Sequence, residues 1–321
     1  MPQKYLCAMI AGCLIALTPA LAEKAAEGDK WWPSEWGAED QRGAANRLTP
    51  RKVMEAAGLI RTGRTYQLGR VYEPGIPLFG NRHYSLTIPG SPTGGPLGEN
   101  RLVWYDEMFS GEIGQVGTQF DGLGHIGTRK GDQDIFYNGF TRSEVGTAYG
   151  LEKLGIENVG VIFTRGVLVD VAEYKGLERL EVGYVITAGD VEGALKKQAV
   201  AVTEGDVVLI RTGHGKLWMV DNETYNSGQP GIGLEAARWL LERKIVMVGA
   251  DTWAVEAVPG EDADGAFRVH ELLIQRNGVY ILENLDLDGL AEDGVYEFAF
   301  VFAPLRLKGA TGSPGNPFAV R

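Results

Sequence analysis

Short runs of β-branched and aromatic residues, bounded by glycine, proline and charged residues, constrain the fold of this chain more than any other feature. Most of them have the length of a β-strand, and few helical patterns lie between them. Strands that alternate with a small number of helices predict an α/β fold built on a mixed sheet. The sequence shows no internal repeat and no shift in composition, which predicts one domain. The predicted strands are residues 102–105, 160–163, 166–171, 206–211, 246–249, 279–282 and 296–302.

Helical patterns are found at three places. Thr49 and Pro50 open the first, because threonine caps a helix and proline suits its first position. Residues 75–100 are instead rich in proline and glycine, which predicts a long irregular loop of the kind that covers binding sites. The three predicted helices are residues 49–59, 190–198 and 234–243.

The first residues have the pattern of a secretory signal peptide. Lys4 supplies a positive start, residues 6–17 are apolar, and Ala20 and Ala22 are the small residues of a cleavage site. The apolar run is too short to cross a hydrocarbon layer of about 30 Å as a helix. We therefore expect an exported protein, periplasmic or secreted, without a membrane span.

Cleavage after Ala22 would remove a signal peptide of residues 1–22 and leave residues 23–321 as a single domain. Both cysteines, Cys7 and Cys13, lie in the part that is removed. The mature chain would then have no disulfide and no thiolate site, so any metal must be bound by nitrogen and oxygen ligands. The alternative is a lipoprotein signal that ends at Cys13.

The chain is acidic, with a formal net charge of −11. It has no run of lysine and arginine interleaved with aromatic residues that could follow a phosphate backbone. These features exclude nucleic acid as an expected partner. An acidic surface favours solubility but does not identify a substrate.

The chain has only four histidines, so few residues could act as imidazole ligands or acid–base groups. One of them, His125, ends a glycine-rich run that also contains Gln115, Gln119 and Asp121. Positions two or four apart on an extended strand face the same side, so these four side chains would converge if the run is extended and curls at its glycines. A carboxylate and an imidazole that project together are the usual ligands of zinc or manganese. The alternative is that Asp121 and His125 only hydrogen-bond the backbone of a glycine-rich turn.

The same run resembles the signature H-x-G-T-H-x-D-x-x-x-H of the putative cyclase family, which includes bacterial kynurenine formamidase and isatin hydrolase. Gly117-Thr118, Asp121 and His125 match the signature, whereas Gln115 and Gln119 stand where the family has histidines. Further segments follow in the family's order, and the resemblance covers the chain from about Trp36 to the C-terminus. They are LIRTG at 209–213, GADT at 249–252, HELL at 270–273, ILENL at 281–285 and PLRLKGATGSP at 304–314.

The resemblance implies an α/β fold of the swivelling β/β/α type, with a mixed, β-barrel-like core and peripheral helices. It also implies a divalent metal, manganese or zinc, as one or two ions. Asp121, His270 and Glu283 correspond to metal ligands, and His125 to the residue that acts on the proton of the attacking water. Gln119 is a further candidate ligand, and its amide oxygen, a harder and weaker donor than imidazole, favours manganese over zinc.

The reaction that the resemblance implies is hydrolysis of an amide C–N bond, in a formamide or a cyclic amide, by metal-activated water. Two alternatives remain: a lactone or ester hydrolase that uses the same site, and a non-catalytic periplasmic binding protein that has lost the metal. Phe109, Phe120 and Trp253 are candidates for the flat wall of a small-molecule pocket, and Gln115 is a further substrate-binding candidate. The family also implies a homo-oligomer, a dimer or a tetramer.

Overall fold

The computed structural model describes residues 30–262 and 264–321. By their contacts, residues 1–31 and 32–321 form separate units, and the elements below all belong to the second. The expected signal peptide, residues 1–22, lies outside the described residues. No helix within the described ranges is long and apolar enough to span a membrane.

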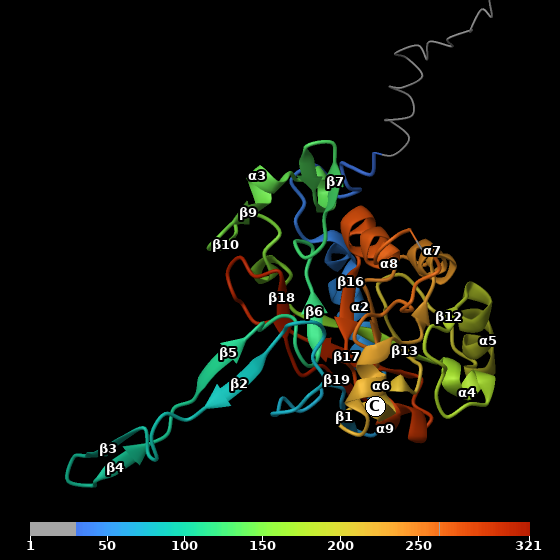
Figure 1. The fold of residues 1–321 in the computed structure, drawn as a ribbon. Helices are drawn as coiled ribbons and strands as arrows, with labels where there is room; N and C mark the ends of the chain where they lie inside the picture. The colour runs from blue at the N-terminus through green and yellow to red at the C-terminus, as the bar shows by residue number, and fades with distance from the viewer. Residues whose placement is uncertain (1–29, 263) are drawn as a thin grey trace, which may run out of the picture. The chain divides into compact units, whose positions relative to one another are not determined.

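A mixed nine-stranded sheet, curled into half a barrel, forms the centre of this unit (Figure 1). Four adjacent strands run parallel, and the remaining pairs are antiparallel. This arrangement confirms the predicted α/β fold with a barrel-like core. In order across the sheet, the strands are β1 (Thr65–Gln67), β19 (Phe318–Val320), β17 (Glu297–Phe302), β11 (Ile162–Asp170), β13 (Val207–Arg211), β15 (Met247–Ala250), β16 (Tyr280–Glu283), β6 (Gln119–Asp121) and β18 (Gly312–Pro314).

Burial on both faces explains the sequences of the parallel strands. Every position of β13, β15 and β16 is buried, and such strands are continuous apolar runs rather than alternating ones. The predictions for 206–211, 246–249 and 279–282 are therefore confirmed to within a residue.

The sequence analysis wrongly predicted two strands where the structure has one. The runs 160–163 and 166–171 form the single strand β11, because Gly166 continues the ladder instead of ending it. The aromatic ring of Phe298, its cross-strand partner, lies where a side chain at position 166 would be. Glycine at this position serves close packing across the ladder and does not mark a turn.

The three predicted helices are confirmed as α2 (Pro50–Ala57), α5 (Ala188–Gln198) and α7 (Leu234–Glu242). Thr49 caps α2 by accepting a hydrogen bond from the backbone N–H of Lys52. The other elements outside the main sheet and the hairpins below are η1 (Gly43–Arg47), β7 (Thr128–Lys130), β8 (Gln133–Ile135), η2 (Tyr137–Gly139), α3 (Arg142–Val145), β9 (Gly146–Thr147), β10 (Gly150–Leu151), η3 (Ile156–Asn158), α4 (Val171–Lys175), β12 (Val185–Ile186), η4 (His214–Leu217), α6 (Asn222–Ser227), β14 (Gly231–Ile232), α8 (Arg268–His270), the π-helix η5 (Glu271–Arg276) and α9 (Asp288–Glu292).

Residues 75–100 do not form the irregular loop that their proline and glycine content predicted. Part of the segment pairs with residues beyond position 100, and the result is two hairpins in succession, residues 84–111, called the arm below. Figure 1 shows the arm extending away from the main sheet. Composition alone missed these strands because their partners lie outside the segment. In the arm, β2 (Tyr84–Thr87) pairs with β5 (Met108–Gly111), and β3 (Gly94–Leu97) pairs with β4 (Leu102–Trp104).

A buried ion-pair cluster lies at the start of β13. Asp206 is fully buried, and its carboxylate accepts hydrogen bonds from Nζ of Lys52 at 2.9 Å and from Nη2 of Arg165 at 2.6 Å. The backbone N–H of Thr203 donates to the same carboxylate at 2.7 Å. Each oxygen of Asp206 thus has a cationic partner, and the cluster ties α2 to β11 and β13.

Candidate metal centre

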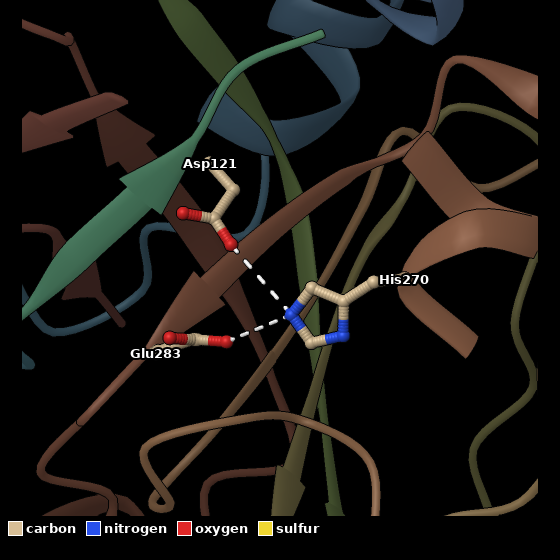
Figure 2. Close-up of side chains that lie close together, drawn as sticks. All are labelled: Asp121, His270 and Glu283. Atoms are coloured by element: carbon tan, nitrogen blue, oxygen red, sulfur yellow. Dashed lines mark hydrogen bonds and ion pairs between the residues drawn. The ribbon is translucent and has the colours of Figure 1, made fainter. Parts of the chain in front are cut away.

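Three chain segments meet at the carboxyl end of β16. Glu283 is the last residue of β16, and Asp121 is the last residue of its antiparallel neighbour β6. His270 reaches the same place from the end of α8, in the connection between β15 and β16. One ligand atom from each residue lies within 4.8 Å of the other two (Figure 2).

The three side chains are buried and in direct contact. Nε2 of His270 lies 3.2 Å from Oε1 of Glu283 and 3.7 Å from Oδ2 of Asp121 (Figure 2). None of the three residues is more than 4% exposed. Two carboxylates and one imidazole, removed from bulk water, form a donor set that suits zinc or manganese.

The carboxylates of Asp121 and Glu283 repel each other, which affects the pKa values in this cluster. Burial and the nearby negative charge of Asp121 raise the pKa of Glu283 above its ordinary value. Burial alone would lower the pKa of His270, but the carboxylates of Glu256 and Glu283 outweigh it and raise that pKa. The centre therefore attracts positive charge, and a divalent cation among the same atoms would displace the proton of His270.

Gln115 and Gln119 contact the two carboxylates. The amide N–H of Gln119 donates to Oε2 of Glu283, its cross-strand neighbour. The amide of Gln115 donates to Oδ1 of Asp121 at 2.8 Å, and its oxygen accepts from Nη2 of Arg82 at 3.0 Å. Because a guanidinium only donates and an ionised carboxylate only accepts, these two neighbours determine the orientation of the Gln115 amide. Ligation by the Gln119 oxygen stays a prediction.

Glu256 contacts His270, and the sequence analysis did not predict it. Its Oε1 lies 2.5 Å from Nδ1 of His270 and also accepts from the backbone N–H of His270 at 3.0 Å. Its Oε2 accepts from the backbone N–H of Val269 at 3.2 Å. A carboxylate on Nδ1 fixes the tautomer of the imidazole and directs Nε2 toward the centre. The signal in the sequence was a lone acidic residue inside the apolar stretch Trp253–Pro259, where burial demands a partner.

The cluster lines a cavity of about 130 Å³. Phe79 and Trp253 form a flat wall, stacked with ring centroids 4.2 Å apart, and Phe267 meets Trp253 edge-on at 6.4 Å. His125 also lines the cavity, and its Nε2 lies 3.9 Å from Oδ1 of Asp121. The other lining residues are Arg82, Gln115, Gln119, Asp121, Ile126, Ala254, His270 and Glu283.

Comparison with known proteins places this geometry in a family. Residues 66–257, more than half of the chain, match the model of the putative cyclase family. This chain belongs to the putative cyclase family. A solved structure described as a novel cyclase is 37% identical, with a TM-score of 0.80 over 89% of this chain and 96% of that one.

Two further cyclase relatives have named activities. A kynurenine formamidase from Bordetella petrii is 34% identical over 109 residues, which are 33% of this chain and 46% of that protein. This chain therefore matches about half the length of that relative. Isatin hydrolase A from Labrenzia aggregata is 22% identical, with a TM-score of 0.57 over 82% of this chain and 94% of that one. The second likeness shows the fold alone.

The residues at the cyclase signature positions line one cavity, whereas an aromatic residue between them does not. Phe120 is fully buried and packs its ring 5.0 Å from that of Tyr280. It lies between Gln119 and Asp121 in β6, and neighbouring residues of a strand face opposite sides. Phe120 is thus a core residue, which corrects its assignment to the pocket wall. The signature residues that line the cavity are Gln115, Gln119, Asp121 and His125.

The structure separates the two remaining pocket candidates, Trp253 and Phe109, and places the two histidines that are not part of the site. Trp253 lines the cavity, but Phe109 lies on the arm in β5, 41% exposed, and is not among the residues that line it. His83 is exposed at the root of the arm, where it contacts Ser110. His214 is fully buried, and burial lowers its pKa.

Proposed function

We propose that this protein is a metal-dependent hydrolase that cleaves the amide C–N bond of a small molecule, in a formamide or a cyclic amide. The observation that carries the proposal is the meeting of Asp121, His270 and Glu283 within 4.8 Å in a cavity that His125 also lines. The name of one cyclase relative, kynurenine formamidase, supports the same reaction class.

Asp121, His270 and Glu283 would hold the metal, since two carboxylates and one imidazole suit both manganese and zinc. When bound, the ion would lower the pKa of a water molecule to about 7 and polarise the substrate carbonyl. Glu256 keeps Nε2 of His270 directed at the centre through its contact with Nδ1.

We further infer that the centre holds one ion. Two histidines of the cyclase signature are replaced by Gln115 and Gln119, whose amide N–H groups donate to Asp121 and Glu283. A nitrogen that donates a hydrogen bond does not ligate a metal, and the oxygen of Gln115 already accepts from Arg82. Metal analysis of the loaded protein tests this inference. One equivalent supports it, and two equivalents contradict it.

His125 is the proposed acid–base residue. Its side chain is 22% exposed, so it contacts both the cavity and water. Imidazole exchanges protons readily near neutral pH, so Nε2 of His125 can take the proton of the attacking water. The same nitrogen then gives this proton to the amide nitrogen, which leaves as the C–N bond breaks.

The cavity walls favour a flat substrate. Phe79, Trp253 and Phe267 present aromatic surface on one side, and Arg82 is the only lysine or arginine among the lining residues. Stacking on the aromatic wall would orient a planar ring, and Arg82 would attract a carbonyl oxygen or a carboxylate.

The test is an activity screen of the manganese-loaded and zinc-loaded protein on arylformamides, cyclic imides, isatin-like lactams and lactones. Faster hydrolysis of an amide than of the matched lactone supports the proposal. A preference for lactones would make the protein an ester hydrolase with the same site. A protein that retains no metal after loading, and hydrolyses neither class, would instead be a binding protein.

A further inference from the structure

A second cavity lies next to the cavity that holds the candidate metal ligands, which is called the site cavity below. The second cavity has a volume of about 200 Å³, compared with about 130 Å³ for the site cavity. Among the residues that the structure describes, Phe267 is the only one that lines both. A residue shared by two cavities forms a partition between them.

The two cavities also meet at a pair of polar side chains. Glu256 lines the second cavity, His270 lines the site cavity, and Oε1 of Glu256 lies 2.5 Å from Nδ1 of His270. Both residues are buried, so this contact is fixed. The ring of Phe267 is held less firmly, because it meets Trp253 and His270 only edge-on, at 6.4 Å and 5.5 Å between ring centroids. Phe267 is therefore the part of the boundary that can be removed without breaking a hydrogen bond between side chains.

The backbone of Phe267 is strained. Its φ of 48° and ψ of 49° place it in the left-handed region, which is unfavourable for a bulky residue. Strain of this kind persists where the surrounding structure imposes it, and it is concentrated at ligand sites. Phe267 is 39% exposed, so burial of its ring offsets little of the cost. Core packing thus does not account for a phenyl ring at this position.

The lining of the second cavity suits an uncharged apolar group. Its acidic side chains already have partners: Glu261 accepts from the backbone N–H of Leu234 at 2.6 Å. Asp262 accepts from Nη1 of Arg268 at 3.2 Å, and Glu256 contacts the ring of His270. The remaining lining side chains are mostly apolar, and they are Ile232, Leu234, Ala257, Val258, Ala266 and Val269.

The volumes set the size of group that each cavity can hold. An apolar cavity of about 150 Å³ holds a benzene ring. The site cavity, of about 130 Å³, thus has room for about one ring, and the second cavity, of about 200 Å³, has room for another. A substrate with two rings could bury both only if the partition between the cavities were open.

We propose that Phe267 is a specificity-determining residue whose ring limits the substrate to a single ring. Removal of the Phe267 ring joins the second cavity to the site cavity, as a subsite for a further apolar ring. The inference rests on the proposed function, which places the substrate in the site cavity, and it adds the residue that sets the size limit.

The test measures, by calorimetry, how the manganese-loaded full chain binds probes of two sizes. The small probe is benzohydroxamate, whose hydroxamate group chelates divalent metals, and the large probes are its 3-phenyl and 4-phenyl derivatives. We expect Phe267→Ala to raise the affinity for at least one large probe relative to the small one by about tenfold or more, because burial of an aromatic ring is worth at least that factor.

The matched control is Phe79→Ala. It also removes a phenyl ring of almost the same exposure, 38%, but Phe79 lines the site cavity alone. This variant should weaken the binding of small and large probes alike and leave the ratio of their affinities unchanged.

A crystal structure of Phe267→Ala gives a readout that needs neither metal nor activity, and it should show one continuous cavity. Two cavities that stay separate would overturn the proposal, and so would an unchanged affinity ratio in a variant that binds benzohydroxamate. If benzohydroxamate binds neither the loaded wild type nor the variant, the proposed function fails, and the crystal structure alone decides whether Phe267 is the partition. Should Phe267→Ala fail to fold, Phe267→Leu repeats both measurements, with a smaller gain of the same sign.

Discussion

Two buried carboxylate clusters lie at opposite ends of the parallel strands. At the amino end, Asp206 precedes β13 and is neutralised by Lys52 and Arg165. At the carboxyl end, Glu283 closes β16 beside Asp121, and their polar partners among the described residues are glutamine amides and histidines.

The different charge balance of the two clusters indicates that they have different roles. Buried charges are tolerated when they are paired and hydrogen-bonded, which is the state of the Asp206 cluster. The Asp121–Glu283 cluster sets two carboxylates against the single positive charge of a protonated His270, so it keeps an excess of negative charge that a divalent cation would balance. Its place at the carboxyl ends of the strands is also where α/β sheets commonly bind ligands. We infer that the Asp206 cluster stabilises the fold, whereas the other is kept for a metal.

Removal of a ligand from the metal cluster should have the largest effect. Asp121→Ala, His270→Ala and Glu283→Ala should each lose the metal and lower turnover by about 10⁴-fold, because a catalytic metal contributes several kcal/mol. Each should also lose the stabilisation by added metal, about 4 kcal/mol at 1,000 times the dissociation constant. Metal analysis and thermal unfolding with and without chelator measure both. Full metal occupancy in any variant would exclude that residue as an essential ligand.

Removal of charge from the other cluster should affect stability alone. Asp206→Asn leaves Lys52 and Arg165 without their buried counter-charge, which should lower the free energy of unfolding by about 3 kcal/mol. Metal affinity should not change. Urea unfolding is the measurement, and Glu178→Gln is the control, because its ion pair with Lys216 is exposed and should contribute nothing measurable. A metal affinity that fell with Asp206→Asn would erase the distinction between the clusters.

The contact of Glu256 with His270 should tune the metal cluster. Glu256→Ala should weaken metal binding by about 100-fold, and Glu256→Gln by about tenfold, because the amide oxygen can still accept from Nδ1. Competition with a chelator gives both dissociation constants. Glu271→Gln is the control, since Glu271 pairs with Arg276 and Arg268 away from the centre. Equal affinities in all three variants would reduce Glu256 to a packing residue.

The smallest expected effect concerns metal preference. If the oxygen of Gln119 ligates, Gln119→His adds a softer donor and should raise the affinity for zinc relative to manganese by about tenfold. Turnover should fall, because a stronger donor makes the metal a weaker Lewis acid. The measurement is the dissociation constant of zinc and of manganese in the wild type and in Gln119→His. Identical ratios would mean that Gln119 acts only as a hydrogen-bond donor to Glu283.

The sequence predicted the elements that depend on nearby residues and missed those that depend on residues far away in the chain. The buried strands β13, β15 and β16 were predictable because their apolar runs need no knowledge of partners. The arm was not, because its strands become recognisable only when residues 84–97 are paired with residues 102–111. The single strand β11 was wrongly predicted as two strands. Gly166 does not end the strand, because it leaves room for the ring of Phe298 in the neighbouring strand.

The same distinction holds for the site. Gln115 to His125 lie in one short run with a recognisable spacing, so their candidacy came directly from the sequence. Glu256 and Arg82 act through contacts 14 and 33 positions away. The only local sign of Glu256 was its charge within an apolar stretch, and no local pattern marks Arg82. Phe109 was placed at the site by residue type alone, and residue type does not say which element carries a ring.

The pairing of β6 with β16 has a consequence for how the protein would acquire a metal. Gln119 and Glu283 are 164 positions apart in the chain, so the donor set does not exist until residue 283 has been made and the sheet has closed. A nascent or translocating chain lacks the set of donors in one place. Because metal availability decides much of metal choice in cells, we expect any ion bound at this centre to be that of the compartment in which folding finishes.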